Sequence, residues 1–478
     1  MIYDIAIIGA GVVGTLTAME LSHYKLNTVL LDKANDVAMG TTKANSAIVH
    51  AGFDAKPGTL KAKLNVRGNE MMPELCERLS VPFKKIGSLV VAFDDEQMNT
   101  VQALYERGLA NGVPGMEIYD QKKLREVEPH INEIARGALW ASTAGVICPY
   151  QLAIAAAENA VLNGTEFKRN FEVENIRFEN GVFTLTCGGE TVQAKYVINC
   201  AGIHSGHIAS LIGDDSIKII FRKGEYMLMD KSMNYLANTV IFQCPSEMGK
   251  GILVTQTVDG NLLIGPSSID MGNEEEDFTT TGDVLDSILQ AARLSVPEVN
   301  TRNVITSFAG IRAHSTKDDF IIEPSEKNGA FINVAGIESP GLTAAPAIAK
   351  YVCDMMQKVM GNVEKKETFE KSRKAPVRFH LLNNEERKAL IEKDKRYGRI
   401  ICRCETITEG EILDAIHSPV PALDVDGVKR RTRAGMGRCQ GGFCGSKVAE
   451  LLAREQGIGL DGVTKFGKNS KLLVGKTK

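Results

Sequence analysis

Apolar stretches that end in glycine-rich turns dominate the pattern of this chain. Residues 2–8 are mostly apolar, as expected for a strand buried on both faces of a parallel sheet. A helical stretch follows to about His23, and a second apolar strand covers residues 27–31. Similar strands recur at residues 196–199 and 330–334, the latter before an alanine-rich helix. The pattern predicts one Rossmann-like α/β domain assembled from segments that lie far apart in the sequence.

The stretches between these segments have a different pattern. Residues 84–140 contain a short apolar strand at 88–93 and then a polar helix. Residues 218–300 contain strands of alternating polarity, such as 225–229 and 251–256. Such alternation is typical of antiparallel sheets with one face on a core. We therefore expect an inserted, mainly antiparallel β-sheet domain that covers the first domain and lines a substrate pocket.

The C-terminal part changes composition again. Residues 361–398 are rich in Lys, Glu and Arg, which predicts a solvated linker with one charged helix around residues 384–394. Two close cysteine pairs mark a small helical domain, and the lysine-rich tail beyond Val463 is expected to fray. The predicted division is a first domain of residues 1–83, 141–217 and 301–360, an inserted domain of 84–140 and 218–300, a linker of 361–398, a cysteine domain of 399–455 and a tail of 456–478.

Composition and charge narrow the class of protein. With 478 residues the chain is too long for one compact core, and its net charge of −3 gives no sign of nucleic-acid binding. No apolar run reaches the length of a membrane span, which leaves only peripheral membrane association open. The chain enters its first strand without a preceding basic region, so no secretion signal is expected. Ten cysteines without a small disulfide framework fit a reducing cytoplasm.

The first glycine turn has the pattern of a dinucleotide-binding motif. Gly9, Gly11 and Gly14 follow the first strand and open the first helix, and Asp32 ends the second strand. Glycines let the backbone approach a pyrophosphate, the helix N-terminus supplies N–H donors, and an acid in this place binds a ribose hydroxyl. The alternative is a glycine turn without a ligand, which would not need the acid at the end of the next strand.

The small-residue loop at 40–46 is able to reach along an extended cofactor. Together with Cys200-Ala201-Gly202 and the late turn at Gly336 and Gly341, it resembles the D-amino-acid-oxidase-like FAD superfamily. The resemblance implies FAD as the cofactor, with the segment around Val173 near the adenine and the segment from Gly341 beside the flavin. The candidate FAD-binding residues are Gly9, Gly11, Val13, Gly14, Asp32, Lys33, Thr41, Thr42, Asn45, Ser46, Val173, Ala201, Gly202, Gly310, Gly336, Gly341, Leu342 and Thr343.

Within that superfamily, two groups of dehydrogenases are most similar. Residues 45–52 and 56–63, with 105–108 and 111–115, resemble the L-2-hydroxyglutarate dehydrogenases. An appended cysteine domain is instead typical of anaerobic glycerol-3-phosphate dehydrogenases and of some opine and amine dehydrogenases. Many respiratory glycerol-3-phosphate dehydrogenases carry an Arg-containing loop where this chain has Phe53-Asp54. Both leading groups oxidise a secondary alcohol with an anionic group, so the resemblance implies a small anionic substrate.

A few residues are candidates for the substrate chemistry. His50 is our first choice as the base for the hydroxyl proton, because an unperturbed imidazole titrates near neutral pH. His314 comes second and His204 third. Arg312 matches an arginine that the family uses to hold substrate anions, and Tyr226 is expected in the same pocket. The structural alternatives are packing histidines, a surface ion pair and an ordinary strand aromatic.

Cys402, Cys404, Cys439 and Cys444 form two close pairs in the sequence. Four thiolates at one point suit a 2Fe–2S cluster or zinc. The run T-R-A-G-M-G-R-C-Q-G-G-F-C resembles the bacterioferritin-associated-ferredoxin-like domain, which implies a 2Fe–2S cluster. Structural zinc and a domain without metal are the alternatives. The basic stretch 429–433 would lower the cost of an anionic cluster, dock an acidic partner, or form a solvated face.

These features together give a leading hypothesis and three alternatives. The leading hypothesis is a cytoplasmic FAD-dependent dehydrogenase that oxidises sn-glycerol 3-phosphate to dihydroxyacetone phosphate. Its electrons would pass through the 2Fe–2S cluster to an electron-accepting protein subunit, either a second flavoprotein or a small redox protein. The alternatives are an L-2-hydroxyglutarate dehydrogenase or oxidase, an amine or opine dehydrogenase, and a non-catalytic electron-transfer flavoprotein subunit.

Overall fold

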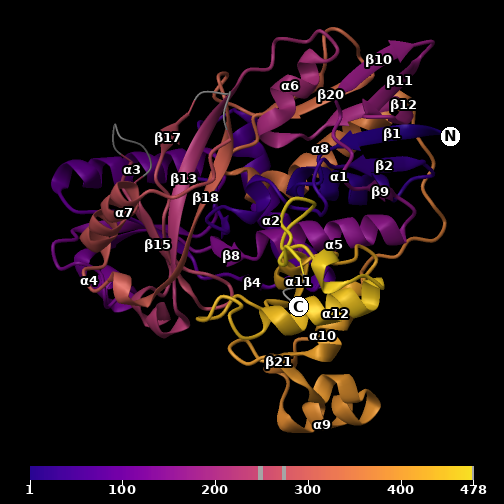
Figure 1. Cartoon of the computed structure of the whole chain (residues 1–478). Coiled ribbons are helices and arrows are strands. Elements are labelled where there is room, and N and C mark those ends of the chain that lie inside the picture. The colour runs from indigo at the N-terminus through magenta and orange to yellow at the C-terminus, as the bar shows by residue number, and fades with distance from the viewer. Residues whose placement is uncertain (246–250, 272–275, 476–478) are drawn as a thin grey trace.

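A computed structural model describes residues 1–245, 251–271 and 276–475. Two large sheets lie side by side, and the cysteine domain packs below them (Figure 1). Positions 246–250 and 272–275 of the predicted inserted domain lie outside the described residues, as do positions 476–478 of the predicted tail.

The first large sheet unites the segments that the sequence placed in one α/β domain. Strands β9, β2, β1, β12 and β20 lie next to one another and run parallel, whereas β10, β11 and β19 pair antiparallel at the margins. The fold prediction is therefore confirmed for this part of the chain. The strands are β1 (Ile2–Ile8), β2 (Thr28–Leu31), β9 (Glu166–Lys168), β10 (Asn175–Glu179), β11 (Val182–Cys187), β12 (Glu190–Asn199), β19 (Ile321–Pro324) and β20 (Phe331–Ala335).

Helices cover one face of this sheet and bury its largest core. Helices α1 (Val12–Leu21), α5 (Pro149–Leu162) and α8 (Gly341–Met360) pack together there, and α2 (Leu60–Arg78) packs on α8. A Cβ atom at Gly68 would clash with the backbone of Thr343, so this glycine allows α2 to approach the start of α8 closely. The N-terminus of α8 also contacts β3 (Ile48–Val49), where Thr343 Oγ1 donates to the Ile48 carbonyl.

The second large sheet is mainly antiparallel, as predicted; β14 and β5 form a parallel pair within it. Its strands are β5 (Ser88–Ala92), β6 (Met116–Asp120), β7 (Gly137–Ala141), β13 (Ile219–Met229), β14 (Val240–Gln243), β15 (Leu253–Gln256), β16 (Leu262–Gly265), β17 (Ile269–Asp270) and β18 (Val304–Ser315). The helices of this region are α3 (Asp95–Ala110), α4 (Gln121–Val127) and α7 (Gly282–Ser295). Because β18 pairs along β13, we group residues 304–315 with the inserted domain in the division that we propose.

Two smaller groups of elements accompany the two large sheets. Three short strands form a small sheet in the order β3 (Ile48–Val49), β8 (Gly145–Ile147) and β4 (Phe83–Lys84). Helix α6 (Ser205–Ser210) follows β12 and contacts β20. Of the helices in the described ranges, none combines the length and the apolar character needed to cross a bilayer.

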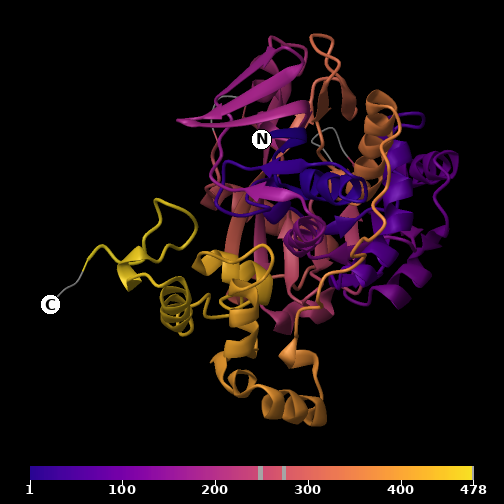
Figure 2. The same cartoon turned by 90° about the vertical axis from the view of Figure 1, so that its right-hand side faces the viewer.

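Residues 361–398 run along the surface of the α/β domain (Figure 2), and most of their side chains are exposed or half-buried, so a solvated linker stays our prediction for them. Arg373 forms a buried ion pair with Glu158 of α5, with 2.5 Å between Nη1 and Oε2. The backbone carbonyl of Glu370 accepts hydrogen bonds from the amides of Asn159 and Asn163. The predicted charged helix is present as α9 (Asn384–Lys393). These contacts fix part of the segment to the domain surface.

The cysteine domain has a small core of its own. It consists of β21 (Ile400–Cys402), β22 (Ile407–Thr408), α10 (Glu409–Ile416), α11 (Val425–Thr432) and α12 (Gly445–Gln456) around residues such as Ile412 and Leu452. The tail beyond it does not fray as expected, because Thr464 and Lys471 pair in a short hairpin. The backbone N–H of Lys465 donates to the Ser470 carbonyl inside that hairpin.

Candidate functional site

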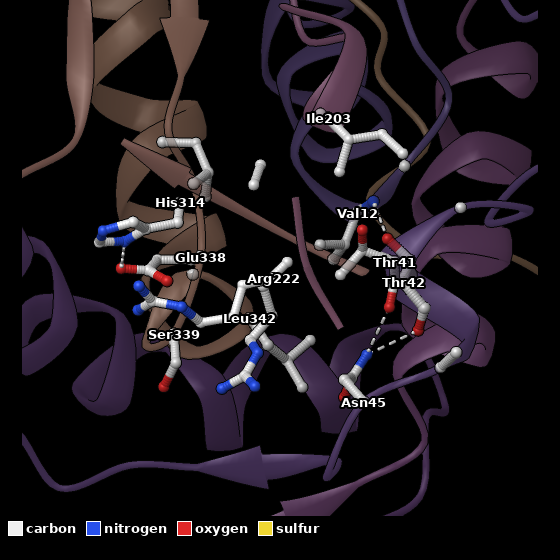
Figure 3. Close-up of a pocket in the computed structure, with 18 of the residues that line it drawn as sticks. Val12, Thr41, Thr42, Asn45, Ile203, Arg222, His314, Glu338, Ser339 and Leu342 are labelled. Carbon is white, nitrogen blue, oxygen red and sulfur yellow. Dashed lines mark hydrogen bonds and ion pairs between the residues drawn. The ribbon is translucent and has the colours of Figure 1, made fainter. Parts of the chain in front are cut away.

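A cleft of about 2590 Å³ is lined by residues of both large sheets. On one side lie Val12, Thr41, Thr42 and Asn45, and on the other lie Arg222, His314, Glu338 and Ser339 (Figure 3). Two chemically different ends therefore share one cavity: a nucleotide end at the start of α1 and a polar end on β13, β18 and the start of α8.

The nucleotide end begins at the turn between β1 and α1. Gly9 has φ = 105°, and a Cβ there would clash with the Cys200 carbonyl. Helix α1 starts at Val12, whose N–H donates to Thr42 Oγ1 over 3.0 Å. A helix N-terminus with glycine backbone at the cavity wall is the arrangement that accepts a pyrophosphate.

Asp32 lines the cleft one strand away from that helix. Its Oδ2 accepts the N–H of Ala10 at 2.6 Å, and its Oδ1 accepts that of Ala34 at 2.8 Å. Burial raises the pKa of Asp32, and the two N–H donors act in the opposite direction. Because a carboxylate offers about four acceptor positions, the two bonds leave capacity for ribose hydroxyls. The residues present therefore fit the adenosine diphosphate part of FAD.

The 40–46 loop is shaped by its own polar side chains. Thr41 Oγ1 donates to the Ile311 carbonyl of β18, and Asn45 Nδ2 donates to the carbonyls of Thr41 and Thr42 (Figure 3). Gly310 permits this contact with β18, because a Cβ there would clash with the backbone of Ala44. The loop thus joins the two sheets across the cleft.

Most candidate cofactor residues line the cleft, and four do not. Those at its wall are Gly9, Gly11, Val13, Asp32, Lys33, Thr41, Thr42, Asn45, Ser46, Val173, Ala201, Gly202, Gly341 and Leu342. Gly14, Gly310, Gly336 and Thr343 lie behind the wall. The first two allow close backbone contacts, and Gly336 takes φ = 66° beside Ser315. We therefore propose supporting roles for these four in place of direct cofactor contact.

Thr343 holds the backbone of the candidate base. Its Oγ1 accepts the N–H of His50 at 2.9 Å and donates to the Ile48 carbonyl. On the other side, Asn69 Nδ2 donates to the His50 carbonyl at 3.0 Å. The His50 ring stacks on Phe242 with centroids 5.7 Å apart. Its Nε2 lies 3.3 Å from Ser339 Oγ at the start of α8, so the ring is fixed at the cleft wall.

Arg312 and Arg222 are direct cross-strand neighbours on β18 and β13, and both line the cleft. Arg222 forms a forked ion pair with Asp270, at 2.6 and 3.1 Å. Arg312 donates from Nη2 to the Ser267 carbonyl, while its buried Nε has no hydrogen-bond partner within the described ranges. A buried, unsatisfied guanidinium nitrogen favours an anionic ligand at this place.

Tyr226 and His314 lie on the same two strands. Tyr226 stacks on Phe308, lies 3.4 Å from Ser46 Oγ, and has its pKa raised by burial. His314 Nδ1 lies 2.9 Å from Glu338 Oε1, which also pairs with Lys61 at 3.0 Å. Burial acts to raise the pKa of Glu338, but the ammonium of Lys61 and the His314 hydrogen bond lower it overall. His314 is thus held in an ion cluster at the polar end.

His204, the third histidine candidate, lies at the nucleotide end. Its Nε2 is 2.9 Å from Lys33 Nζ and 3.0 Å from Glu276 Oε1. It is therefore placed with the cofactor residues instead of with Arg312.

Sequence reasoning missed several polar residues of the cleft, namely Arg222, Glu338, Ser339 and Lys61. Glu338 and Ser339 stand between the two glycines of the late turn, so their position was a usable signal. Arg222 can be recognised as a neighbour of Arg312 only from the pairing of β13 with β18. Arg107 of α3 also lines the cleft and donates to the Asp54 carbonyl at 3.1 Å, close to where the expected arginine loop is missing.

The four cysteines stand as two neighbouring pairs. Cys404 and Cys439 have their sulfurs 3.7 Å apart, and Cys402 shares a hydrogen bond with Cys444 that lowers the pKa of Cys402. Among the described residues, no three or more His, Cys, Asp or Glu side chains surround a single point as one ion requires. Two pairs fit a 2Fe–2S cluster, in which each iron takes two protein ligands.

The basic stretch around α11 docks the cysteine domain onto the two larger domains. Asp36, four residues after Asp32, pairs with both Arg430 and Arg431. Arg433 pairs with Asp259 of the inserted domain and with Glu405. The sequence suggested that these arginines dock an acidic partner. In the structure they bind carboxylates of the same chain.

Fold, cleft and cysteine pairs together define a flavoprotein with an attached iron–sulfur domain. Residues 4–355 match the model of the FAD dependent oxidoreductase family, and residues 400–454 match the BFD-like [2Fe-2S] binding domain. The chain belongs to the FAD dependent oxidoreductase family. Its cofactors are FAD, which supplies a two-electron acceptor when bound, and a 2Fe–2S cluster.

Particular relatives narrow the comparison. The chain is 51% identical over 476 residues to a protein of Caloramator mitchellensis named "Glycerol 3-phosphate dehydrogenase", covering 100% of this chain and 99% of that one. The structure matches dithionite-reduced L-alpha-glycerophosphate oxidase from Mycoplasma pneumoniae with FAD bound at a TM-score of 0.74 and 30% identity, over 78% of this chain and 98% of that one. A human mitochondrial L-2-hydroxyglutarate dehydrogenase is 27% identical, over 74% of this chain and 89% of that protein.

Proposed function

We propose that the protein oxidises sn-glycerol 3-phosphate to dihydroxyacetone phosphate and delivers the electrons through its 2Fe–2S cluster to a partner protein. The observation that carries the proposal is the full-length similarity to the Caloramator mitchellensis protein, which extends through the cysteine domain. The L-2-hydroxyglutarate relative is less similar and shares only about three quarters of the chain.

In the reaction, the carbinol carbon of the substrate gives up a hydride and its hydroxyl gives up a proton. We assign the proton to His50, whose ring is held between Phe242 and Ser339. Ser339 orients the imidazole, and the backbone contacts of Thr343 and Asn69 fix its place. The loss of a hydride and a proton leaves a carbonyl group, so the product is the ketone.

Arg312 is our candidate for binding the phosphate. Its buried Nε has no hydrogen-bond partner among the residues that the structure describes, whereas the charge of neighbouring Arg222 is already paired with Asp270. Arg222 and His314 add positive or hydrogen-bonding groups at the same end of the cleft. Tyr226 beside them would exclude water by its buried ring. This arrangement favours a compact anion over an uncharged alcohol.

Anaerobic titration tests the substrate directly. We expect about one and a half equivalents of sn-glycerol 3-phosphate to bleach the absorbance of the bound flavin completely, because each substrate gives two electrons, the flavin takes two and the cluster takes one. L-2-hydroxyglutarate and a secondary amine serve as comparison substrates in the same cuvette. Stronger bleaching by either would move the assignment to that alternative.

The Arg312→Met variant is the matched control for the titration. Its flavin should still bleach with dithionite, whereas glycerol 3-phosphate should be needed at a much higher concentration. If no substrate bleaches the wild-type flavin although dithionite does, the protein is an electron-transfer subunit and the proposed activity fails.

For the partner, we propose a small redox protein with an acidic surface that docks at the exposed edge of the cysteine pairs. Phe443, next to Cys444 in the sequence, is 84% exposed, and Arg403 and Cys404 of the first cysteine pair's loop are exposed as well. Exposed aromatic and arginine side chains are the groups that dominate protein interfaces. The positive charge of Arg403 favours an acidic surface on the partner.

The Phe443→Ala variant should reduce an acidic ferredoxin roughly ten-fold more slowly than the wild type, as expected for the loss of one interface anchor. Flavin bleaching by substrate should not change. Phe178→Ala, which alters an exposed phenylalanine on β10, provides the control. Equal ferredoxin rates for the wild type and both variants would place the docking site elsewhere.

We also propose a reducing cytoplasm as the location, because none of the ten cysteines, which all lie in the described ranges, forms a disulfide. Cell fractionation followed by immunoblotting would test it, and recovery of the protein outside the cytoplasmic fraction would contradict it.

A further inference from the structure

We propose that the C-terminal hairpin, residues 464–471, forms part of the FAD site at its adenosine end. FAD binding and docking of the cysteine domain would then stabilise each other. The inference goes beyond the proposed function, because it concerns only how the cofactor is held and does not depend on the substrate.

The hairpin is a built element fixed to the start of α11. Its strands pair between Thr464 and Lys471, and Phe466 N–H donates to Ser470 Oγ at 2.7 Å. The N–H groups of Val425 and Asp426 donate to the carbonyls of residues 464 and 465. These bonds hold the tip of the hairpin, residues 466–469, at a defined place above α11.

The tip of the hairpin reaches the cleft. Phe466, Gly467, Lys468 and Asn469 line the same cavity as Asp32 and the 40–46 loop. In Figure 1, a yellow loop near the C-terminus rises above α11 toward the α/β domain. A Cβ on Gly467 would come within 3.3 Å of Asn35 Oδ1, so the hairpin lies directly against the segment that follows β2.

One buried carboxylate joins the three parts. Asp424 Oδ2 accepts hydrogen bonds from Asn35 Nδ2 at 2.5 Å and from Gly467 N–H at 3.0 Å. Its Oδ1 caps α11 by accepting the N–H of Gly427 at 2.6 Å. Asp424 therefore connects the nucleotide segment, the hairpin and the first turn of α11 through a single side chain.

A second buried contact holds the same segment. Asp36 is paired with Arg430 and Arg431 of α11, with the closest oxygen–nitrogen distances at 2.7 and 2.8 Å. Burial acts to raise the pKa of Asp36, but the two guanidinium groups hold it well below its usual value. Residues 33–36 thus lie between the cleft on one side and the cysteine domain on the other.

The position of the hairpin along the cofactor follows from the motif. The pyrophosphate belongs at the start of α1 and the ribose at Asp32, so the adenosine extends past Asp32 toward Asn35 and Val173. The hairpin tip stands at this end and offers an aromatic ring in Phe466 and an amide in Asn469. An aromatic wall with a few polar groups is typical of a cofactor pocket.

The test is a chain that ends after Lys465 and so lacks the hairpin tip. We expect its dissociation constant for FAD, measured by quenching of flavin fluorescence, to rise about ten-fold, within the usual range for coupled sites. ADP serves as a competitor that carries only the adenosine end, and its affinity should fall by a similar factor. A chain that ends after Val474 keeps the hairpin and should bind both ligands as the full chain does.

The electron paramagnetic resonance spectrum of the reduced cluster shows whether the cysteine domain is intact. The Phe466→Ser variant repeats the measurement without shortening the chain. An intact cluster signal with unchanged FAD and ADP affinities in both variants would overturn the proposal. Weaker FAD binding with unchanged ADP binding would also overturn it, because the hairpin would then act away from the adenosine end.

Discussion

Replacing His50 with glutamine is expected to slow substrate oxidation by about 10³-fold, within the range that general base catalysis contributes. Glutamine is close in size, so it should keep the packing on Phe242 and a hydrogen bond to Ser339. It cannot take a proton from the substrate hydroxyl near neutral pH. The measurement is the rate of flavin bleaching by sn-glycerol 3-phosphate in an anaerobic stopped-flow instrument.

His314→Gln is the matched control, since His314 lies at the same end of the cleft but is tied to Glu338. We expect this variant to change the substrate concentration needed for half-maximal rate more than the maximal rate. Both variants should retain FAD, as judged by the absorbance of the purified protein. If the His314 variant lost most of the rate and the His50 variant lost little, the roles of the two histidines would be reversed.

The parts of the site that local spacing determines were accessible from the sequence. The β1–α1 turn, Asp32 and the two cysteine pairs each depend on residues close together in the chain, and the structure brings them to the cleft or to one another. The predicted antiparallel sheet also follows from alternation along single strands. Such features can be predicted from the sequence because a few consecutive residues determine their geometry.

What the sequence did not reveal depends on contacts between distant segments. Arg222 meets Arg312 only through the register of β13 and β18, which no local pattern fixes. Gly310 and Thr343 fit the family motif but act behind the cleft wall, because they accommodate Ala44 and hold His50. The linker and the tail make contacts that the sequence did not reveal, for a related reason. Their charged composition resembles solvated chain, and their partners lie on other domains.

Arg433 is a buried charge that joins the cysteine domain to the inserted domain. It ends α11 in a left-handed conformation, with φ = 74°. Its Nη1 lies 2.5 Å from Asp259 Oδ2, and its Nε lies 2.8 Å from Glu405 Oε2. Glu405 follows Cys404 directly, so this guanidinium links the loop that carries a cluster ligand to the sheet that lines the cleft.

The Arg433→Met variant should destabilise the docked cysteine domain by about 3–5 kcal/mol, the usual cost of leaving buried carboxylates without their partner. Lys231 still pairs with Glu405, so Asp259 should account for most of the loss.

Thermal unfolding and protease cleavage within residues 361–398 measure the detachment. Reduction of an added ferredoxin should slow. With FAD kept in excess, to offset weaker binding when the hairpin is displaced, substrate should still bleach the bound flavin at the wild-type rate, because the residues around the substrate are unchanged. Arg438→Met, which removes an exposed pair with Asp230, is the control and should leave all three readouts nearly unchanged. Parallel loss of flavin bleaching in the Arg433 variant would show that the arginine stabilises the whole fold and does not specifically hold the two domains together.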